Sequence, residues 1–387
     1  MPSYQSPGVY VEEMPPSSRP IAGVGTSTAG FVGVVPNSII MPAKPDGSGN
    51  NYAIADVSKP YLVTNWIDFI TRFGEIQAGN ANLAHAVFGF FHNGGTRCWV
   101  IRVASDADLT AGADEFNEFA AIDEIAIVAA PGIVSQAVQQ ALLDHCRATG
   151  DRVAVLDGAK TPSTITATDI SSTGRSESGS YGAIYFPWLS VNDPTSTTGS
   201  QIIVPPSGHI AGIYARSDAT RGVHKAPANE VVMGALGLAY RISKAQQNAL
   251  NPEGINVIRE FNGALKVWGG RTRADESHSE YCYISTRRYM NYLRKSIDDS
   301  TQWVVFEPNA PSLWKRISRT LTDFLTNEWR AGALFGETPK GAFYVKCDAD
   351  TNPADVRELG HVVTEIGVAI VKPAEFVIFR IQQTTSG

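Results

Sequence analysis

The stretch EIAIVAAPGIVSQAVQQALLDHCRATGDRVAVLDG, from Glu124 to Gly158, decides the fold class. It opens and closes with continuous apolar runs that have the length of buried strands. The residues between these runs predict a helix, with Ser135 as its N-terminal cap and Gly150 as its end. Strands that are apolar throughout and alternate with helices indicate a mainly parallel sheet, covered by helices on both faces.

The sequence on either side continues this pattern. Apolar runs predict further strands at residues 21–35, 97–103, 181–189, 341–348 and 366–383. Apolar residues at helical spacing predict helices at residues 65–74, 83–95, 229–243, 285–297 and 310–332. Residues 36–60 and 159–180 are rich in small and polar residues, which is typical of surface loops.

These elements divide the chain into four predicted parts. Residues 1–20 form an arm, because their recurring prolines exclude a helix. Residues 21–105 form a small α+β domain, residues 106–372 a large α/β core domain, and residues 373–387 a second arm. The expected fold class is therefore α/β and α+β, with ample chain for a sizeable core.

Each arm contains a strand that lacks a local partner. Residues 6–16, SPGVYVEEMPP, alternate as a strand that Pro15 and Pro16 bring to an end. Even a complete two-stranded hairpin is only marginally stable in water, so this strand needs a partner from elsewhere. At the other end of the chain, Phe376 to Phe379 are apolar on both faces, and we expect cover on both sides of that strand.

Composition excludes several classes of function. The 387 residues carry a net charge of −6 and so lack the basic footprint of a nucleic-acid-binding protein. The four cysteines, at positions 98, 146, 282 and 347, form no CxxC pair, which argues against a zinc or redox site. The sequence shows neither a basic and apolar leader nor a run of 18 apolar residues. We therefore expect a protein that folds in the cytoplasm and does not insert into a membrane.

The sequence offers one weak candidate for catalysis. The glycines at 23, 25 and 30 do not form a dinucleotide-binding GxGxxG, and neither a P-loop nor an HExxH occurs. Ser207 and His209 lie close together in the chain, and Asp157 ends a predicted strand, so a serine hydrolase is an alternative hypothesis. The simpler interpretation is a loop between strand and helix, because no GxSxG elbow surrounds the serine. We expect no cofactor and no metal.

The predicted helix at residues 310–332 has two distinct faces. Apolar residues recur along one face at i, i+4 and i+8 from Leu313. Lys315, Arg316 and Arg319 cluster on the opposite face. Such a stripe is either a solvated face or a docking face for an acidic partner, and the residues alone leave both possibilities open.

A series of motifs runs along the chain in a fixed order. The opening PGVYVEE and RPIAGVGTSTAGFVG are followed by DFITRFG, FFHNGGTRCWVIRV, PPSGHIAGIYARSDATRGVHKAPAN, LNPEGINVIREF, VWGGRTR, STRRYMNYLRKSI, FEPNAPSLW, EWRAGALFG and KPAEFVIFRI. Over nearly the whole chain these motifs resemble the contractile tail sheath proteins of myophage tails, R-type pyocins and phage-tail-like contractile injection systems. Residues 36–60 and 159–200 carry no such resemblance.

The resemblance implies a structural protein and not an enzyme. Such subunits stack as six-membered rings around an inner tube, and contract from a metastable extended state to drive the tube through a target envelope. The implied core has a subtilisin-like topology without a catalytic triad. The implied partners are further copies of the chain, the inner tube protein, and baseplate and tail terminator proteins. Assembly would take place in the bacterial cytoplasm, to give part of a virion tail or a released particle. A non-contractile filament or shell protein is a further alternative.

The resemblance also implies roles for particular residues. In the family, both arms add a strand to the sheet of an adjacent subunit. The residues expected to exchange are Pro7, Gly8, Val9, Tyr10, Val11, Glu12 and Glu13 in the first arm, and Glu375, Phe376, Val377, Ile378, Phe379, Arg380 and Ile381 in the second. Family sheaths use a helix near residues 310–332 against the tube, which makes Lys315, Arg316 and Arg319 the candidate tube contact.

Overall fold

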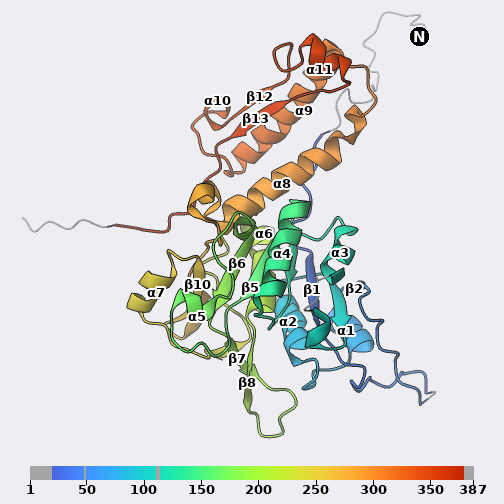
Figure 1. The fold of residues 1–387 in the computed structure, drawn as a ribbon, viewed down its shortest axis with the longest axis vertical. Helices are drawn as coiled ribbons and strands as arrows, with labels where there is room; N and C mark the ends of the chain where they lie inside the picture. The colour runs from blue at the N-terminus through green and yellow to red at the C-terminus, as the bar shows by residue number, and fades with distance from the viewer. Residues whose placement is uncertain (1–19, 48, 110–113, 379–387) are drawn as a thin grey trace, which may run out of the picture. The chain divides into compact units, whose positions relative to one another are not determined.

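The computed structural model describes residues 20–47, 49–109 and 114–378 of the chain (Figure 1). The chain forms two compact units. Among the described residues, the larger unit comprises those from 24 to 295 and from 370 to 378, and the smaller unit comprises residues 20–23 and 296–369. The division falls within the long helix α8 (Ile284–Thr301). This helix confirms the one predicted at residues 285–297.

An eight-stranded sheet forms the centre of the larger unit, in the order β11-β10-β6-β5-β4-β1-β3-β2. All neighbouring strands from β10 across to β3 are parallel, and only the edge strands β11 and β2 run antiparallel to their neighbours. The predicted mainly parallel sheet is thus confirmed. Strands from both sides of residue 105 belong to this one sheet. The strands are β1 (Ala29–Val34), β2 (Tyr61–Val63), β3 (Cys98–Val103), β4 (Ile127–Ala129), β5 (Val153–Asp157), β6 (Gly182–Phe186), β10 (Ile255–Phe261) and β11 (Ala264–Val267).

The stretch from Glu124 to Gly158 folds as its pattern predicts, into β4, α4 (Gln136–Thr149) and β5. Ser135 is the extended residue before the helix as predicted, but its side chain makes no capping hydrogen bond there, and at the other end the backbone N–H of Gly150 donates to the carbonyl of Cys146. Gly150 has a φ of 68°, a left-handed conformation that glycine adopts readily because it has no Cβ. All residues of β4 and β5 are buried, because helices cover both faces of the sheet.

The hydrophobic core has two layers, one on each face of the sheet. Phe31 of β1 belongs to the layer that also holds Phe90 of α2 and Ile210 of α6. Val32, the next residue, belongs to the opposite layer with Phe119 of α3, as the alternation of side chains along a strand requires. The helices of the larger unit, besides α4 and most of α8, are α1 (Trp66–Phe73), α2 (Ala81–His92), α3 (Asp114–Ala120), α5 (Ala167–Ile170), α6 (Ser207–Arg221) and α7 (Lys244–Leu250), with 3₁₀ turns η1 (Asp106–Leu109), η2 (Ser178–Tyr181) and η3 (Glu276–Tyr281).

A second sheet of three antiparallel strands, in the order β8-β7-β9, corrects one prediction. The helix predicted at residues 229–243 is wrong, because this stretch contains β9 instead. Gly234 has a φ of 81°, which ends any helix there, and the side chain of Asn93 hydrogen-bonds both backbone groups of Met233 at 2.9 and 3.1 Å. These contacts come from a distant part of the chain and override the local spacing. The strands are β7 (Leu189–Asn192), β8 (Gln201–Val204) and β9 (Ala235–Leu238).

Helix α9 (Pro311–Arg330) organises the smaller unit and confirms the helix predicted at 310–332. Leu313 and Ile317 are buried on its inner face, and Ile366 of the neighbouring sheet packs against their cluster. That sheet consists of two antiparallel strands, the first of which was predicted from the apolar run at 341–348. The remaining elements of the smaller unit are η4 (Gln302–Val304), α10 (Pro339–Ala342), β12 (Phe343–Lys346), α11 (Ala354–Glu358) and β13 (Glu365–Val368).

Candidate functional site and assembly surfaces

Asp157 and Ser207 of the alternative hydrolase hypothesis meet in the structure, but in a structural role. Ser207 is the first residue of α6, and its Oγ donates a 2.7 Å hydrogen bond to Oδ2 of Asp157 at the end of β5. The backbone N–H of Ser207 donates to Oδ1 at 2.8 Å, and that of Gly132 to Oδ2 at 2.9 Å. The carboxylate therefore satisfies one backbone donor at the start of α6 and one in the loop after β4. Burial raises the pKa of Asp157 to about 6, while its hydrogen bonds act in the opposite direction.

His209 does not complete a triad with these residues. Its ring packs against α2, where a Cβ on Gly89 would collide with it. Within the described part of the chain, His209 Nδ1 has no hydrogen-bond partner. Burial lowers the pKa of His209 to about 3, so the imidazole is neutral at ordinary pH. Because Asp157, Ser207 and His209 are all buried, the group is a joint between β5 and α6 that a substrate does not reach.

This joint fills the edge of the sheet where parallel α/β folds commonly bind ligands, beyond the carboxyl ends of the strands. Asp157 there links β5, the loop after β4 and the start of α6. Among residues 20–47, 49–109 and 114–378, no group of His, Cys, Asp and Glu is arranged to hold a metal ion. In the same part of the chain, no helix has the length and apolar character to cross a bilayer.

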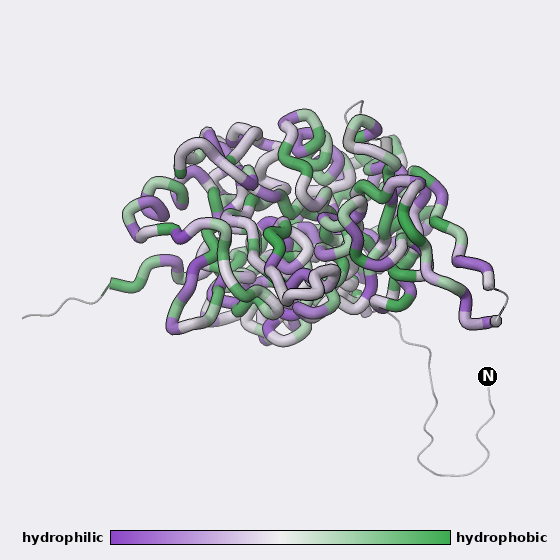
Figure 2. Tube along the Cα trace, turned by 90° about the horizontal axis from the view of Figure 1, so that it is seen from below, coloured by the Kyte–Doolittle hydropathy of each residue, from purple (hydrophilic) through white to green (hydrophobic). Residues whose placement is uncertain are grey.

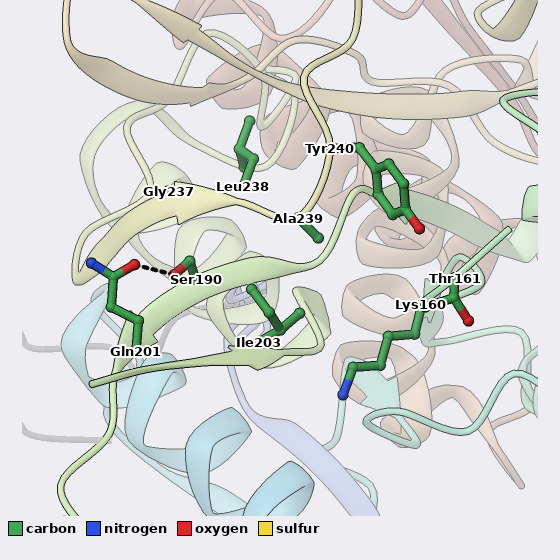
Figure 3. Close-up of a pocket in the computed structure, with 9 residues that line it drawn as sticks. All are labelled: Lys160, Thr161, Ser190, Gln201, Ile203, Gly237, Leu238, Ala239 and Tyr240. Atoms are coloured by element: carbon green, nitrogen blue, oxygen red, sulfur yellow. Dashed lines mark hydrogen bonds between the residues drawn. The ribbon is translucent and has the colours of Figure 1, made fainter. Parts of the chain in front are cut away.

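An open cavity of about 390 Å³ lies beside the three-stranded sheet (Figure 3). At one end Ser190 Oγ donates a 2.6 Å hydrogen bond to Oε1 of Gln201. Lys160 and Tyr240 lie at the other end, and the ammonium of Lys160 is 5.1 Å from the centre of the Trp188 ring. Ser190, Gln201 and Lys160 thus interact within the protein, and the residues that line the cavity form no cluster of titratable groups for catalysis.

The predicted C-terminal arm is described in part. Residues 371–378 have no regular secondary structure, and the side chains at 376, 377 and 378 are 72, 69 and 79% exposed. Figure 2 shows these last described residues as a hydrophobic segment that leads to the grey trace. Residues 379–381 of the predicted exchange strand lie outside the described residues, and so do residues 7–13 of the other arm. Exposed apolar residues in a row are the signature of a surface that another molecule covers.

Glu375 is the exception in this segment, because its own unit holds it. The carboxylate accepts hydrogen bonds from the side chains of Arg271, Tyr283 and Asn251. The sequence placed Glu375 in the strand to be exchanged, and its three partners lie 92 to 124 residues earlier in the chain. In the sequence, Glu375 is visible only as a single carboxylate before the apolar run at 376–379. That pattern does not identify the side chains that bind it.

The cations predicted to contact the tube lie on the exposed side of α9. Lys315 is exposed, and Arg319 approaches Asp323 only at 4.0 Å, with the two side chains 71 and 66% exposed. An exposed pair at that distance contributes little to stability. Lys315 and Arg319 are therefore accessible charges, while Arg316 is engaged in a further contact.

Arg316 holds a loop to which the sequence patterns assign no role. Its Nη1 lies 3.2 Å from Glu307 Oε2, and its guanidinium carbon lies 4.4 Å from the centre of the Trp303 ring. Between these two partners, Val305 is 58% exposed and Phe306 is fully exposed with a φ of 66°. Bulky residues rarely adopt a positive φ, and no sequence pattern reveals it. The loop thus presents an aromatic side chain beside the cationic stripe.

The sheet of β12 and β13 is a third surface of interest. It contains only two strands within the described part of the chain, so the outer edge of each lacks a strand partner there. Tyr344 of β12 is 59% exposed, while the other face packs on α9. The backbone groups of an open edge form a ready template for an added strand.

Family models match two consecutive parts of this chain. Residues 103–273 match the phage tail sheath protein central domain, and residues 276–384 match the phage tail sheath C-terminal domain. Together these ranges cover most of the chain, including the core of the sheet and the whole of α9.

Among curated proteins, the tail sheath protein of Vibrio phage KVP40 is 28% identical over 186 residues, which are 47% of this chain and 27% of the relative. The tail sheath protein of Burkholderia phage BcepMu is 24% identical over 209 residues, which are 52% of this chain and 42% of the relative. The chain thus spans less than half the length of these two relatives.

Among solved structures, the similarity extends over whole chains. A sheath subunit of the extracellular contractile injection system PVC in its contracted state is 26% identical, with a TM-score of 0.75 and 99% of both chains covered. A subunit of the contracted helical sheath of the anti-feeding prophage is 29% identical, with a TM-score of 0.74, 99% of this chain and 100% of that chain covered.

Proposed function

This chain belongs to the phage tail sheath protein family, which includes the sheaths of contractile injection systems, and we propose that it is the contractile sheath subunit of such a particle. The observation that carries the proposal is the match of 99% of the chain to subunits of two contracted sheaths. The family is structural, and the burial of Asp157, Ser207 and His209 agrees with a non-enzymatic role.

The proposed mechanism is a change of packing between subunits. Stacked six-membered rings surround an inner tube in a metastable extended state, and a trigger releases the free energy stored in that packing. Each subunit moves as a rigid body, and the tube is driven through a target envelope. The two-layered core with its fully buried central strands supports this view, because close-packed protein interiors transmit strain without deforming continuously.

We propose strand exchange as the link that survives this motion. The exposed apolar residues 376–378 end a segment without regular structure, and the sheet of β12 and β13 has open edges within the described residues. Addition of a strand to such an edge supplies backbone hydrogen bonds together with side-chain contacts. Residues 7–13 and residues 376–381, the part of the predicted second strand beyond Glu375, would each enter the sheet of a different neighbour. Head-to-tail contacts of this kind between one ring and the next need not close on themselves, and they then extend the stack into an open helical assembly.

The cationic stripe of α9 is the proposed contact to the inner tube. Lys315 and Arg319 are accessible and so available to an acidic tube surface, while Arg316 supports the contact by holding the loop that carries Phe306. Exposed charges at an interface contribute to orientation and to the rate of association more than to affinity. A contact of this kind therefore suits a sheath that must dissociate from the tube during contraction. A baseplate partner is supported by the similar subunit in the anti-feeding prophage baseplate structure. We further propose a tail terminator partner, and assembly in the bacterial cytoplasm.

Electron microscopy of purified particles tests the proposed function. Particles are imaged before and after treatment with acid or urea, and the lengths and widths of the sleeves are measured. We expect two populations, one long and narrow and one short and wide. A single set of dimensions under all conditions would instead identify a static filament or shell.

A further inference from the structure

We propose that Glu375 is a positioning residue, which clasps the root of the C-terminal arm to its own subunit so that the arm leaves the body at a fixed point and in a fixed direction. The proposal rests on the strand exchange proposed above. It goes beyond that exchange because it assigns a role to one residue and to the three side chains that hold it. We call the four side chains Asn251, Arg271, Tyr283 and Glu375 the clasp.

Within the clasp, the other three side chains donate hydrogen bonds to both carboxylate oxygens of Glu375. Oε1 accepts from Arg271 Nε at 2.9 Å and from Asn251 Nδ2 at 2.7 Å. Oε2 accepts from Arg271 Nη2 at 2.7 Å and from Tyr283 Oη at 2.8 Å. A bidentate arginine–carboxylate pair fixes geometry as well as charge, which a single flexible contact does not.

The three donors belong to the folded body of the larger unit. Asn251 directly follows α7, and Tyr283 directly precedes α8. Arg271 and Tyr283 also pair with one another through a backbone bridge, and the Arg271 guanidinium lies 6.0 Å from the Tyr283 ring centre. The donors thus belong to elements that the folded body holds in place, and Arg271 and Tyr283 support one another through contacts that do not involve Glu375.

The clasp is shielded, whereas the chain beyond it is not. The side chains of Arg271 and Glu375 are 21 and 19% exposed. The next residue, Phe376, is already 72% exposed. Partial burial strengthens an ion pair relative to one at the surface, because water and salt screen it less. The boundary between the anchored and the free part of the arm therefore falls at Glu375.

Such an anchor promotes assembly by lowering the entropy lost when the arm pairs. Without the clasp, the residues from about 370 onward would sample many directions, and each must be ordered when the strand joins a neighbour. With the clasp, only the chain beyond Glu375 remains to be ordered. Preorganisation of this kind raises affinity without adding a contact to the partner.

The experiment uses the full-length chain and its Glu375→Ala, Glu375→Gln and Tyr283→Phe variants. Glu230→Ala is the matched control, because the Lys225–Glu230 pair is similarly shielded, at 22 and 26% exposure, and lies in the same unit. Two quantities are measured, namely hydrogen exchange of residues 371–378 in the monomer and the protein concentration at which polymers form. Electron microscopy counts the polymers.

We expect Glu375→Ala to speed exchange at 371–378 and to raise the polymerisation concentration at least about tenfold, since tenfold corresponds to a modest loss of interaction free energy. Glu375→Gln and Tyr283→Phe should shift both readouts in the same direction by less, because each keeps part of the hydrogen bonding. Glu230→Ala should resemble the wild type in both. A merely structural role would change unfolding without changing exchange at 371–378 selectively.

A chain shortened to residues 1–373 separates the two proposals. If the shortened chain polymerises like the wild type, strand exchange by the C-terminal arm is wrong. If it fails while Glu375→Ala polymerises at the wild-type concentration, strand exchange stands and the clasp is overturned. If Glu375→Ala does not fold, the other two variants decide. The clasp is overturned if Tyr283→Phe and Glu375→Gln both show the hydrogen-exchange rate at residues 371–378 and the polymerisation concentration of the wild type.

Discussion

Arg288 of α8 and Asp218 of α6 form a buried ion pair, with 2.5 Å between Nη2 and Oδ2 and side chains only 3 and 7% exposed. Thr26 joins this pair, since its Oγ1 donates to Asp218 Oδ2 at 2.5 Å and its carbonyl accepts from Arg288 Nη2 at 3.1 Å. The chain before β1 is thus anchored by a buried charge pair, just as Glu375 anchors the chain near its other end.

Loss of one partner of this buried pair should destabilise the larger unit strongly. We expect Arg288→Ala to lower the free energy of unfolding by about 3–5 kcal/mol, because Asp218 is left as a buried, uncompensated charge. Chemical denaturation of the monomer measures the loss. As a control, Lys59→Ala should leave the free energy of unfolding nearly unchanged, because the side chains of the Lys59–Asp56 pair are 65 and 61% exposed. Equal losses for both variants would contradict the proposed burial of Arg288.

The Asp157 joint predicts a pH dependence of stability with a definite sign. The pKa of Asp157 in the folded chain is about 6, above its ordinary value of 3.8, so the folded state binds more protons than the unfolded state between these values. The stabilising contribution is therefore complete below about pH 4 and is lost as the pH rises through about 6. For two pKa units the loss amounts to roughly 3 kcal/mol.

Comparison with Asp157→Asn isolates this contribution from other groups. The advantage of the wild type in free energy of unfolding should shrink between pH 4 and pH 7, since the amide does not titrate. Denaturation at several pH values measures the difference. An advantage that grows with pH would show instead that the hydrogen bonds from Ser207 and Gly132 outweigh burial.

Deletion of residues 1–13 should separate folding from assembly. The shortened chain should remain soluble and should unfold at nearly the wild-type denaturant concentration, because the proposed exchange strand serves a neighbouring subunit. The same chain should form no long sheaths in electron micrographs. Unfolding of the shortened chain would mean that the strand belongs to the core of its own subunit.

Charge reversal on α9 tests the proposed tube contact. Lys315→Glu with Arg319→Glu should leave the monomer as stable as the wild type, because both side chains are solvated, but should reduce the yield of sheaths assembled on tubes at least tenfold. Arg241→Glu is the control, since that side chain is 91% exposed and lies outside α9. A normal yield of extended particles from the double variant would refute the contact.

Reversal of Arg316 should act differently from reversal of its neighbours. Arg316→Glu removes the contacts to Glu307 and Trp303, and we therefore expect a local increase in hydrogen exchange around residues 303–307 as well as weaker assembly. If exchange in that loop is unchanged, Arg316 does not hold it, and the residue is one more solvated charge.

The sequence predicted those parts of the fold whose signal is local. The helix α9 and the unit of β4, α4 and β5 are recognisable because apolar periodicity, apolar runs and the residues that end each element agree within each segment. The helix predicted at residues 229–243 is wrong because the apolar spacing of this stretch suits a helix, whereas Asn93 and the neighbouring strand β7 hold the backbone extended. Partners separated by more than a hundred residues leave no trace in a local pattern.

The candidate sites show the same limit. Lys315 and Arg319 were found because a helical stripe is visible in the sequence, and their exposure agrees with that stripe. The loop of Phe306 and the partners of Glu375 were missed, because a positive φ and a contact between distant segments depend on the complete fold. Asp157 and Ser207 were noticed for the wrong reason, since proximity in a fold does not distinguish a cap from a catalytic pair.

If the proposed strand exchange holds, the edges of the β12–β13 sheet that lack a strand partner among the described residues set the number of neighbours that one subunit can bind. Under strand exchange, each chain donates two strands and accepts two. A subunit inside the assembly is therefore linked to its neighbours by four strand-pairing contacts. A subunit at the end of the polymer has sheet edges or arm strands that remain unpaired. Growth and loss are then confined to the ends, and a finished sleeve is stable only when another protein closes its last row.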